Sequence, residues 1–187
     1  GKSTFAKLIA KALTIETGEF HRDGKMRVGW FHQHQIEAMD PEDTPLQIIL
    51  RAMPDASESS RRSRLAQFGL PFEKQETKVE ALSGGERARL LLNLVAMDAP
   101  HILILDEPAN GLDPAGIHWM RTLLRDYANR GGTVLLSSHL LHEIEIIADE
   151  ILVIGQGRIV AHAPGKERPA FYNLWSDADT ARAVAGL

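Results

Sequence analysis

The chain has 187 residues, of which 44% are apolar and 25% are charged, and its formal net charge is −4. This size and composition predict a globular chain of about one domain with enough apolar residues to build a core. The negative balance excludes a global basic field, the lack of cysteine excludes disulfides and thiolate metal sites, and no apolar run is long enough for a membrane helix.

The first four residues, Gly1-Lys2-Ser3-Thr4, match the end of the phosphate-binding motif G-x-x-x-x-G-K-[ST]. Apolar residues then recur at helical spacing from Phe5 onward, which predicts that the tetrapeptide lies at a helix N-terminus. There Lys2 would reach the β- and γ-phosphates, Ser3 would ligate Mg²⁺, and backbone N–H groups would hold anionic oxygens. A helix start with an incidental lysine is the alternative that four residues leave open.

The following elements alternate between strand and helix patterns. A hairpin is predicted around Asp23-Gly24, and two short helices are predicted from Pro45 and Ser57. A third helix follows Ser83, and the apolar runs HILILD and TVLLSS predict buried strands on either side of a long helix. Two more strands are predicted in ILVI and RIVA. This order predicts an α/β fold with a mostly parallel sheet, plus a small helical subdomain at about 41–97.

The segment LSGGE combines a helix-capping serine with two glycines. Ser83 is expected to cap the helix, while Gly84 and Gly85 leave the backbone open to a second anion. An ordinary helix cap with a flexible entry is the alternative.

The segment HILILDEP ends a buried strand in two carboxylates, Asp106 and Glu107. Because successive side chains on a strand point in different directions, one can hold Mg²⁺ while the other faces the γ-phosphate and orients a water. A polar strand end before Pro108 is the alternative. LLSSH places His139 at the end of the next strand, where it could hydrogen-bond the γ-phosphate. Asp113 in NGLDP is expected to cap a helix.

Taken in order, these motifs resemble the nucleotide-binding domain of the ABC ATPases over residues 1–161. GKST resembles the end of Walker A, LSGGE the signature motif, LILDEP Walker B with the catalytic glutamate, NGLDP the D-loop and SSH the switch histidine. Gln33 resembles the Q-loop glutamine, with Gln35 as the neighbouring alternative. The resemblance implies a P-loop NTPase-like sheet with flanking helices, and leaves 162–187 as a tail of unclear role.

The resemblance also implies ATP and Mg²⁺ as cofactors and assigns roles to individual residues. Catalytic roles fall on Glu107, His139 and Gln33, and Mg²⁺ ligation falls on Ser3, Gln33 and Asp106. Nucleotide binding falls on Gly1, Lys2, Ser3, Thr4, Ser83, Gly84, Gly85, Glu86 and Asp113. A second cassette, in a homodimer or a fused protein, would present its Ser83 segment to the γ-phosphate.

Two features depart from the family pattern. The family places a strand and an adenine-stacking aromatic residue before the phosphate loop, so we expect a chain that starts at Gly1 to bind ATP weakly. Residues 25–107 resemble the ABC-F branch, soluble twin-cassette proteins that act on the ribosome. Residues 108–161, through Ala109–Asp113 and His139–Leu141, resemble exporter ATPases of the bacitracin-resistance kind.

The function expected from these resemblances is ATP-driven conformational work through head-to-tail dimerisation. We expect the ATPase subunit of an ABC exporter, which would be cytoplasmic, would dock on a membrane permease at the inner face of the membrane through the helices at 44–69, and would not itself insert. The alternatives are an ABC-F translation factor that binds the ribosome and its RNA, and an inactive truncated or chimeric fragment.

Two other patterns have weaker functional interpretations. His32 and His34 share a strand face and could ligate a metal, but no third ligand is evident. The arginines could contact RNA phosphates, although a solvated helix face is the favoured interpretation; they are Arg61, Arg62, Arg64, Arg87 and Arg89.

Overall fold

The computed structural model of the chain describes residues 2–137, 148–155, 158–164 and 171–176. Within them one six-stranded sheet has the order β1-β2-β3-β6-β4-β5. Every neighbouring pair is parallel except β4 and β5. The strands are β1 Val28–His32, β2 Ile102–Asp106, β3 Thr133–Ser137, β4 Glu150–Gly155, β5 Arg158–Pro164 and β6 Phe171–Ser176. This confirms the predicted α/β fold with a mostly parallel sheet.

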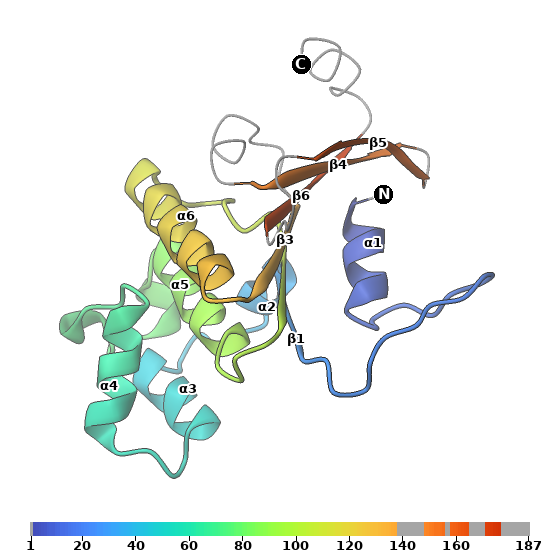
Figure 1. The fold of residues 1–187 in the computed structure, drawn as a ribbon. Helices are drawn as coiled ribbons and strands as arrows, with labels where there is room; N and C mark the ends of the chain where they lie inside the picture. Colours follow the sequence, from blue (N-terminus) through green and yellow to red (C-terminus); the bar gives the residue numbers. More distant parts are fainter. Residues whose placement is uncertain (1, 138–147, 156–157, 165–170, 177–187) are drawn as a thin grey trace.

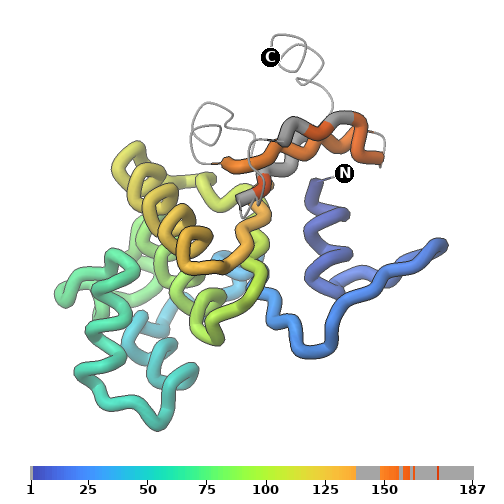
Figure 2. Tube along the Cα trace, in the orientation of Figure 1, coloured from blue at the N-terminus to red at the C-terminus, as the bar shows by residue number. Residues whose placement is uncertain are grey.

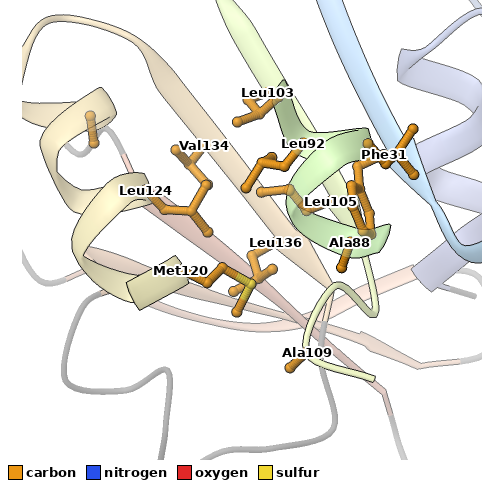
Figure 3. Packing of buried hydrophobic residues seen from close by; sticks show 12 residues of the cluster. Phe31, Ala88, Leu92, Leu103, Leu105, Ala109, Met120, Leu124, Val134 and Leu136 are labelled. Atoms are coloured by element: carbon orange, nitrogen blue, oxygen red, sulfur yellow. The ribbon is translucent and has the colours of Figure 1, made fainter. Parts of the chain in front are cut away.

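Helices cover both faces of the sheet (Figure 1). Helix α1 (Lys2–Ile9) packs on β2, β3 and β6, whereas α5 (Gly84–Val95) packs on β1 and α6 (Pro114–Asn129) on β3. Ile104 and Leu135 lie in the cluster that contains Ala6 of α1. Figure 3 shows Leu105 and Leu136 in the other cluster, which α5 and α6 complete. Because both faces of the sheet are covered at β2 and β3, these two strands are apolar almost throughout.

The helical subdomain has a core of its own. It contains α3 (Pro45–Ala52), α4 (Glu58–Gln67) and the 3₁₀ turns Phe72–Lys74 and Val79–Ala81, and α2 (Gln33–Glu37) leads into it from β1. Its buried side chains are Ile49, Leu65, Leu70, Val79, Leu82 and Leu90. Leu90 belongs to α5, so this helix joins the subdomain to the sheet. Figure 2 shows the subdomain and the β4–β5 pair at opposite ends of the molecule.

The contact between α5 and β1 depends on a glycine. A Cβ atom added at Gly29 would lie 2.8 Å from the carbonyl oxygen of Val95 and 3.0 Å from Pro100 Cγ. Since backbone atoms cannot yield as a flexible side chain does, only glycine permits this close approach.

Two segments differ from the sequence prediction. The hairpin around Asp23-Gly24 is not formed, because β1 pairs with β2 and residues 10–27 contain no strand. Local side-chain bonds organise that segment instead: Asp23 Oδ1 accepts from the Lys25 N–H (2.7 Å), and Arg22 donates to the carbonyls of Ile9 and Met26. The tail, for which no element was predicted, contributes β6, which lies inside the sheet between β3 and β4.

Within the described ranges, no helix combines the length and the apolar character that crossing a membrane requires.

Candidate functional site

The site is built where three parallel strands end. His32, Asp106 and Ser137 are in register across β1, β2 and β3, so the residues that follow them meet at the carboxyl edge of the sheet. Helix α1 directs its N-terminus to the same edge, because Lys2 Nζ lies 3.0 Å from Glu107 Oε1. Two of the predicted site residues, distant in sequence, are therefore in direct contact.

Glu107 has an unusual backbone conformation. Its φ is 52°, in the left-handed region that non-glycine residues seldom occupy, and its N–H donates to the carbonyl oxygen of Ser137 (2.8 Å). Its side chain is 25% exposed and that of Lys2 is 14% exposed. Such strain persists only when the surrounding structure enforces it, and it concentrates at functional sites.

Asp106 has a carboxylate oxygen suited to a cation. Its Oδ1 is buried and has no hydrogen-bond partner among the described residues, and the same holds for Ser137 Oγ. Buried polar atoms are normally paired, so this oxygen is available for a ligand. Hydroxyl, amide and carboxylate oxygens are hard ligands of the kind that Mg²⁺ takes, and the predicted set of Ser3, Gln33 and Asp106 therefore fits that ion.

The structure separates the two candidate glutamines. Gln35 Oε1 accepts from the His32 N–H (3.0 Å), so this side chain closes the N-terminus of α2. Gln33 is exposed, and its Oε1 accepts from Asn110 Nδ2 at 3.4 Å. Gln33 is therefore the glutamine that remains available at the strand ends. Sequence reasoning missed Asn110, since only its position between Glu107 and Asp113 pointed to it.

The pKa of His32, which precedes Gln33, is lowered by burial and further by the charges of His34 and Lys7, against the opposing effect of Asp106. Its imidazole is therefore neutral at pH 7. The rings of His32 and His34 are 6.2 Å apart. Across the described part of the chain, no group of three or more His, Cys, Asp or Glu side chains is placed to hold a metal ion.

The LSGGE segment forms a complete capping box at the start of α5. Ser83 Oγ accepts from the Glu86 N–H (3.2 Å), and Glu86 Oε2 accepts from the Ser83 N–H (2.8 Å). Glu86 Oε1 also lies 3.2 Å from Lys74 Nζ. The Glu86 carboxylate is thus used for capping, and a nucleotide contact from it stays a prediction. Ser83 and Gly84 are exposed, so the segment can meet a partner.

The loop before α6 packs beside that segment. Asp113 Oδ1 accepts from the Gly116 N–H (2.8 Å), which confirms the expected helix cap. A Cβ atom at Gly84 would lie 3.3 Å from the carbonyl oxygen of Gly111. The signature segment and the 110–113 loop therefore form one surface of the chain.

The remaining predicted residues fall into two groups. Ser3 and Thr4 are exposed in the first turn of α1, next to Lys2. Gly1 and His139 lie outside the described residues, so their predicted roles are not placed by the structure.

The comparisons with known proteins agree with this arrangement. The family described as "ABC transporter" matches residues 1–110. The chain is 36% identical to "ABC transporter F family member 4" of Arabidopsis thaliana, over 85% of this chain and 23% of that protein. It is 31% identical to "Protein GCN20" of Saccharomyces cerevisiae, over 85% of this chain and 21% of that protein. It is also 31% identical to "Probable ATP-binding protein YheS" of Escherichia coli K12, over 85% of this chain and 24% of that protein.

The chain thus spans less than a quarter of the length of these relatives. Among solved structures, the dimeric bacterial ABC transporter cassette MJ0796 matches with a TM-score of 0.75 and 21% identity, over 90% of this chain and 82% of that one. Its post-hydrolysis state with ADP and Pi matches with a TM-score of 0.74 over the same shares of the two chains. These structures share the fold. The family model matches more than half of the chain, including Lys2 and Glu107 in their contact at the strand ends, and the chain therefore belongs to the ABC transporter family.

Proposed function

We propose that this chain is an ATP-binding and ATP-hydrolysing cassette of the ABC-F type, which does conformational work on the ribosome by pairing head to tail with a second cassette. The contact between Lys2 and Glu107 carries the ATPase part of the proposal, because it places a phosphate-binding cation beside a carboxylate that can receive a proton. The F-family name of the Arabidopsis relative supports the ABC-F branch. The sequence motifs favoured an exporter ATPase, with the ABC-F factor as the alternative, and this proposal reverses that preference.

In this mechanism Lys2, with Ser3 and Thr4 in the first turn of α1, binds the triphosphate. Ser3, Gln33 and Asp106 would hold Mg²⁺, whose charge when bound neutralises phosphate oxygens. Glu107 orients the attacking water and accepts its proton, and we assign the γ-phosphate contact to His139.

Closure requires a second cassette. The N-cap Ser83 and the first residue of α5, Gly84, are exposed, so the N-terminal end of this helix is accessible on this chain. We infer that they contact the triphosphate held by the partner cassette. Hydrolysis removes that shared anion, and the two cassettes then separate.

A second candidate is the ATPase subunit of an exporter that docks on a permease. The residues Ala109–Asp113 support it, because they resemble the bacitracin-type exporter ATPases rather than the ABC-F pattern. The F-family name of the Arabidopsis relative favours the ABC-F branch, for which we propose the ribosomal function.

Co-sedimentation separates the two. The protein carrying this cassette, with Glu107→Gln to slow hydrolysis, is loaded with ATP and fractionated at low salt. We expect it to pellet with ribosomes when ATP is present and to leave them when ATP is absent. Recovery in the membrane fraction with a permease, and not with ribosomes, would refute the ABC-F function.

A further inference from the structure

A groove of about 850 Å³ lies at the edge of the sheet opposite to Lys2 and Glu107. His101 and Gly132, which directly precede β2 and β3, belong to its lining, so we call it the amino-edge groove. The charged and aromatic side chains in its lining are those of Arg64, Phe68, His101, Asp126, Tyr127 and Arg130. Five-residue strands separate this groove from the nucleotide site, a distance of roughly 16 Å along the sheet.

Arg64 is the arginine of the group singled out in the sequence that lines this groove. Arg62 pairs with Glu58 and Glu76, whereas Arg61 and Arg89 donate to backbone carbonyl oxygens elsewhere. Arg64 Nε donates to Asn93 Oδ1 (2.7 Å) and its Nη2 to the Asn93 carbonyl oxygen (3.3 Å).

Among the described residues no hydrogen bond or ion pair joins Arg64 to a carboxylate. Burial lowers the pKa of its guanidinium, and the charge of Asp98 opposes this effect only in part. A half-buried cation whose hydrogen bonds go only to neutral acceptors gains stability when an anion reaches it.

Two further donors line the same groove. Arg130 is exposed directly after α6. His101 Nδ1 accepts from the Arg27 N–H (3.0 Å), which places the imidazole hydrogen on the exposed Nε2. Asp126 is the carboxylate in the lining, and the charge of Asp98 acts on Arg64 from outside it. Within the lining, two guanidinium groups face one carboxylate, which suits a ligand that carries one negative charge at each contact rather than a triphosphate.

Aromatic surface completes the groove. The Tyr127 hydroxyl donates to the Pro100 carbonyl oxygen, and the ring packs so closely on Gly132 that any side chain there would overlap it. The ring of Phe68 lies beneath the Arg64 guanidinium, with 5.4 Å between the ring centroid and Cζ. A fixed aromatic face beside cations is the combination that binds unpaired nucleotides.

We propose that the amino-edge groove binds single-stranded RNA, with a phosphodiester on Arg64 and Arg130 and a base on the face of Tyr127. The proposal rests on the ribosomal function proposed above, and it names the nucleic-acid chemistry that this cassette contacts.

The test is fluorescence anisotropy with a labelled ten-nucleotide uridine RNA at low salt. The double variant Arg64→Gln/Arg130→Gln should raise Kd at least about tenfold and reduce the slope of log K against log salt by about one. The matched control, Arg51→Gln/Lys25→Gln, removes the same charge elsewhere on the surface and should leave Kd unchanged. Neither variant should alter ATP turnover.

Arg130→Gln alone changes an exposed side chain and should leave the fold intact. A higher Kd of this variant therefore supports the site even if Arg64→Gln unfolds the subdomain. If the wild type, the Arg130 variant and the double variant bind the RNA with equal Kd, the proposed RNA site is wrong. It is also wrong if the wild type binds duplex RNA as tightly as single-stranded RNA. If the groove variants lose RNA binding while the wild type never pellets with ribosomes, the groove stands and the ribosomal function fails. If the wild type pellets with ribosomes while all variants bind the RNA with equal Kd, the ribosomal function stands and the RNA site in the groove fails.

Discussion

Lys2 and Glu107 are 105 positions apart in the chain, yet Nζ of the first lies 3.0 Å from Oε1 of the second. In this pair each charge balances the other in a partly buried setting. We propose that a triphosphate bound at α1 would contact Lys2 in place of Glu107. The pair would then link the binding of phosphate to the availability of Glu107 as a base.

Glu107→Gln should slow ATP hydrolysis by about 100-fold or more while ATP binding is retained, because the amide cannot accept the proton of water and no longer competes for Lys2. Steady-state phosphate release and equilibrium binding of labelled ATP measure the two effects on the protein that carries this cassette. Glu80→Gln, on an exposed 3₁₀ turn, is the matched control and should hydrolyse ATP normally. Turnover equal to the wild type would exclude Glu107 as the base.

Ser83→Arg should prevent pairing of the cassettes without abolishing nucleotide binding, because the large cation would stand where the partner's triphosphate must approach. Gel filtration with ATP and filter binding measure the two properties. Ser57→Arg is the matched control, since Ser57 is also an exposed serine cap whose Oγ accepts from a backbone N–H, that of Ser60 (3.2 Å). An ATP-dependent dimer of the Ser83 variant would contradict the proposed interface.

Glu86 should contribute to stability at neutral pH and lose that contribution in acid. Burial raises the pKa of Glu86, but the hydrogen bonds from Ser83 and the pairing with Lys74 outweigh it, so the pKa lies below the ordinary value of 4.5. A depressed carboxyl pKa stabilises the fold above the unfolded pKa, and this stabilisation disappears as the pH falls through the folded pKa.

The wild type should therefore exceed Glu86→Gln in free energy of unfolding at pH 7, by less than about 1 kcal/mol, and the two should converge in acid, once the pH lies below the folded pKa of Glu86. Urea denaturation at both pH values measures the difference. A gap that does not narrow in acid would mean that the charge of Glu86 has no part in the cap.

Gly29→Ala should reduce the free energy of unfolding by about 1–3 kcal/mol, because its Cβ would meet the Val95 carbonyl oxygen at 2.8 Å. Gly24→Ala is the control, since a Cβ there has no atom within 4 Å and the backbone φ is not positive. Thermal and urea unfolding of the two variants test the close approach of α5 to β1. Equal stability would show that α5 can shift without cost.

Features that depend on neighbouring residues were evident from the sequence alone. The helix caps at Ser83 and Asp113 need only the backbone N–H three residues later. The apolar runs of β2 and β3 predict strands that are buried on both faces. The phosphate-loop end, the signature segment and the strand-end acids were also recognisable, because each is a short run of chemically distinctive residues.

Tertiary structure decided what no short segment encodes. The insertion of β6 between β3 and β4 depends on hydrogen bonds to two strands elsewhere in the chain, so its own periodicity could not reveal it. The acceptor of Arg64, Asn93 of α5, followed from how the subdomain packs on that helix. The reason is common to both: sequence sets local geometry, whereas pairing between distant groups is set by the packing of whole elements.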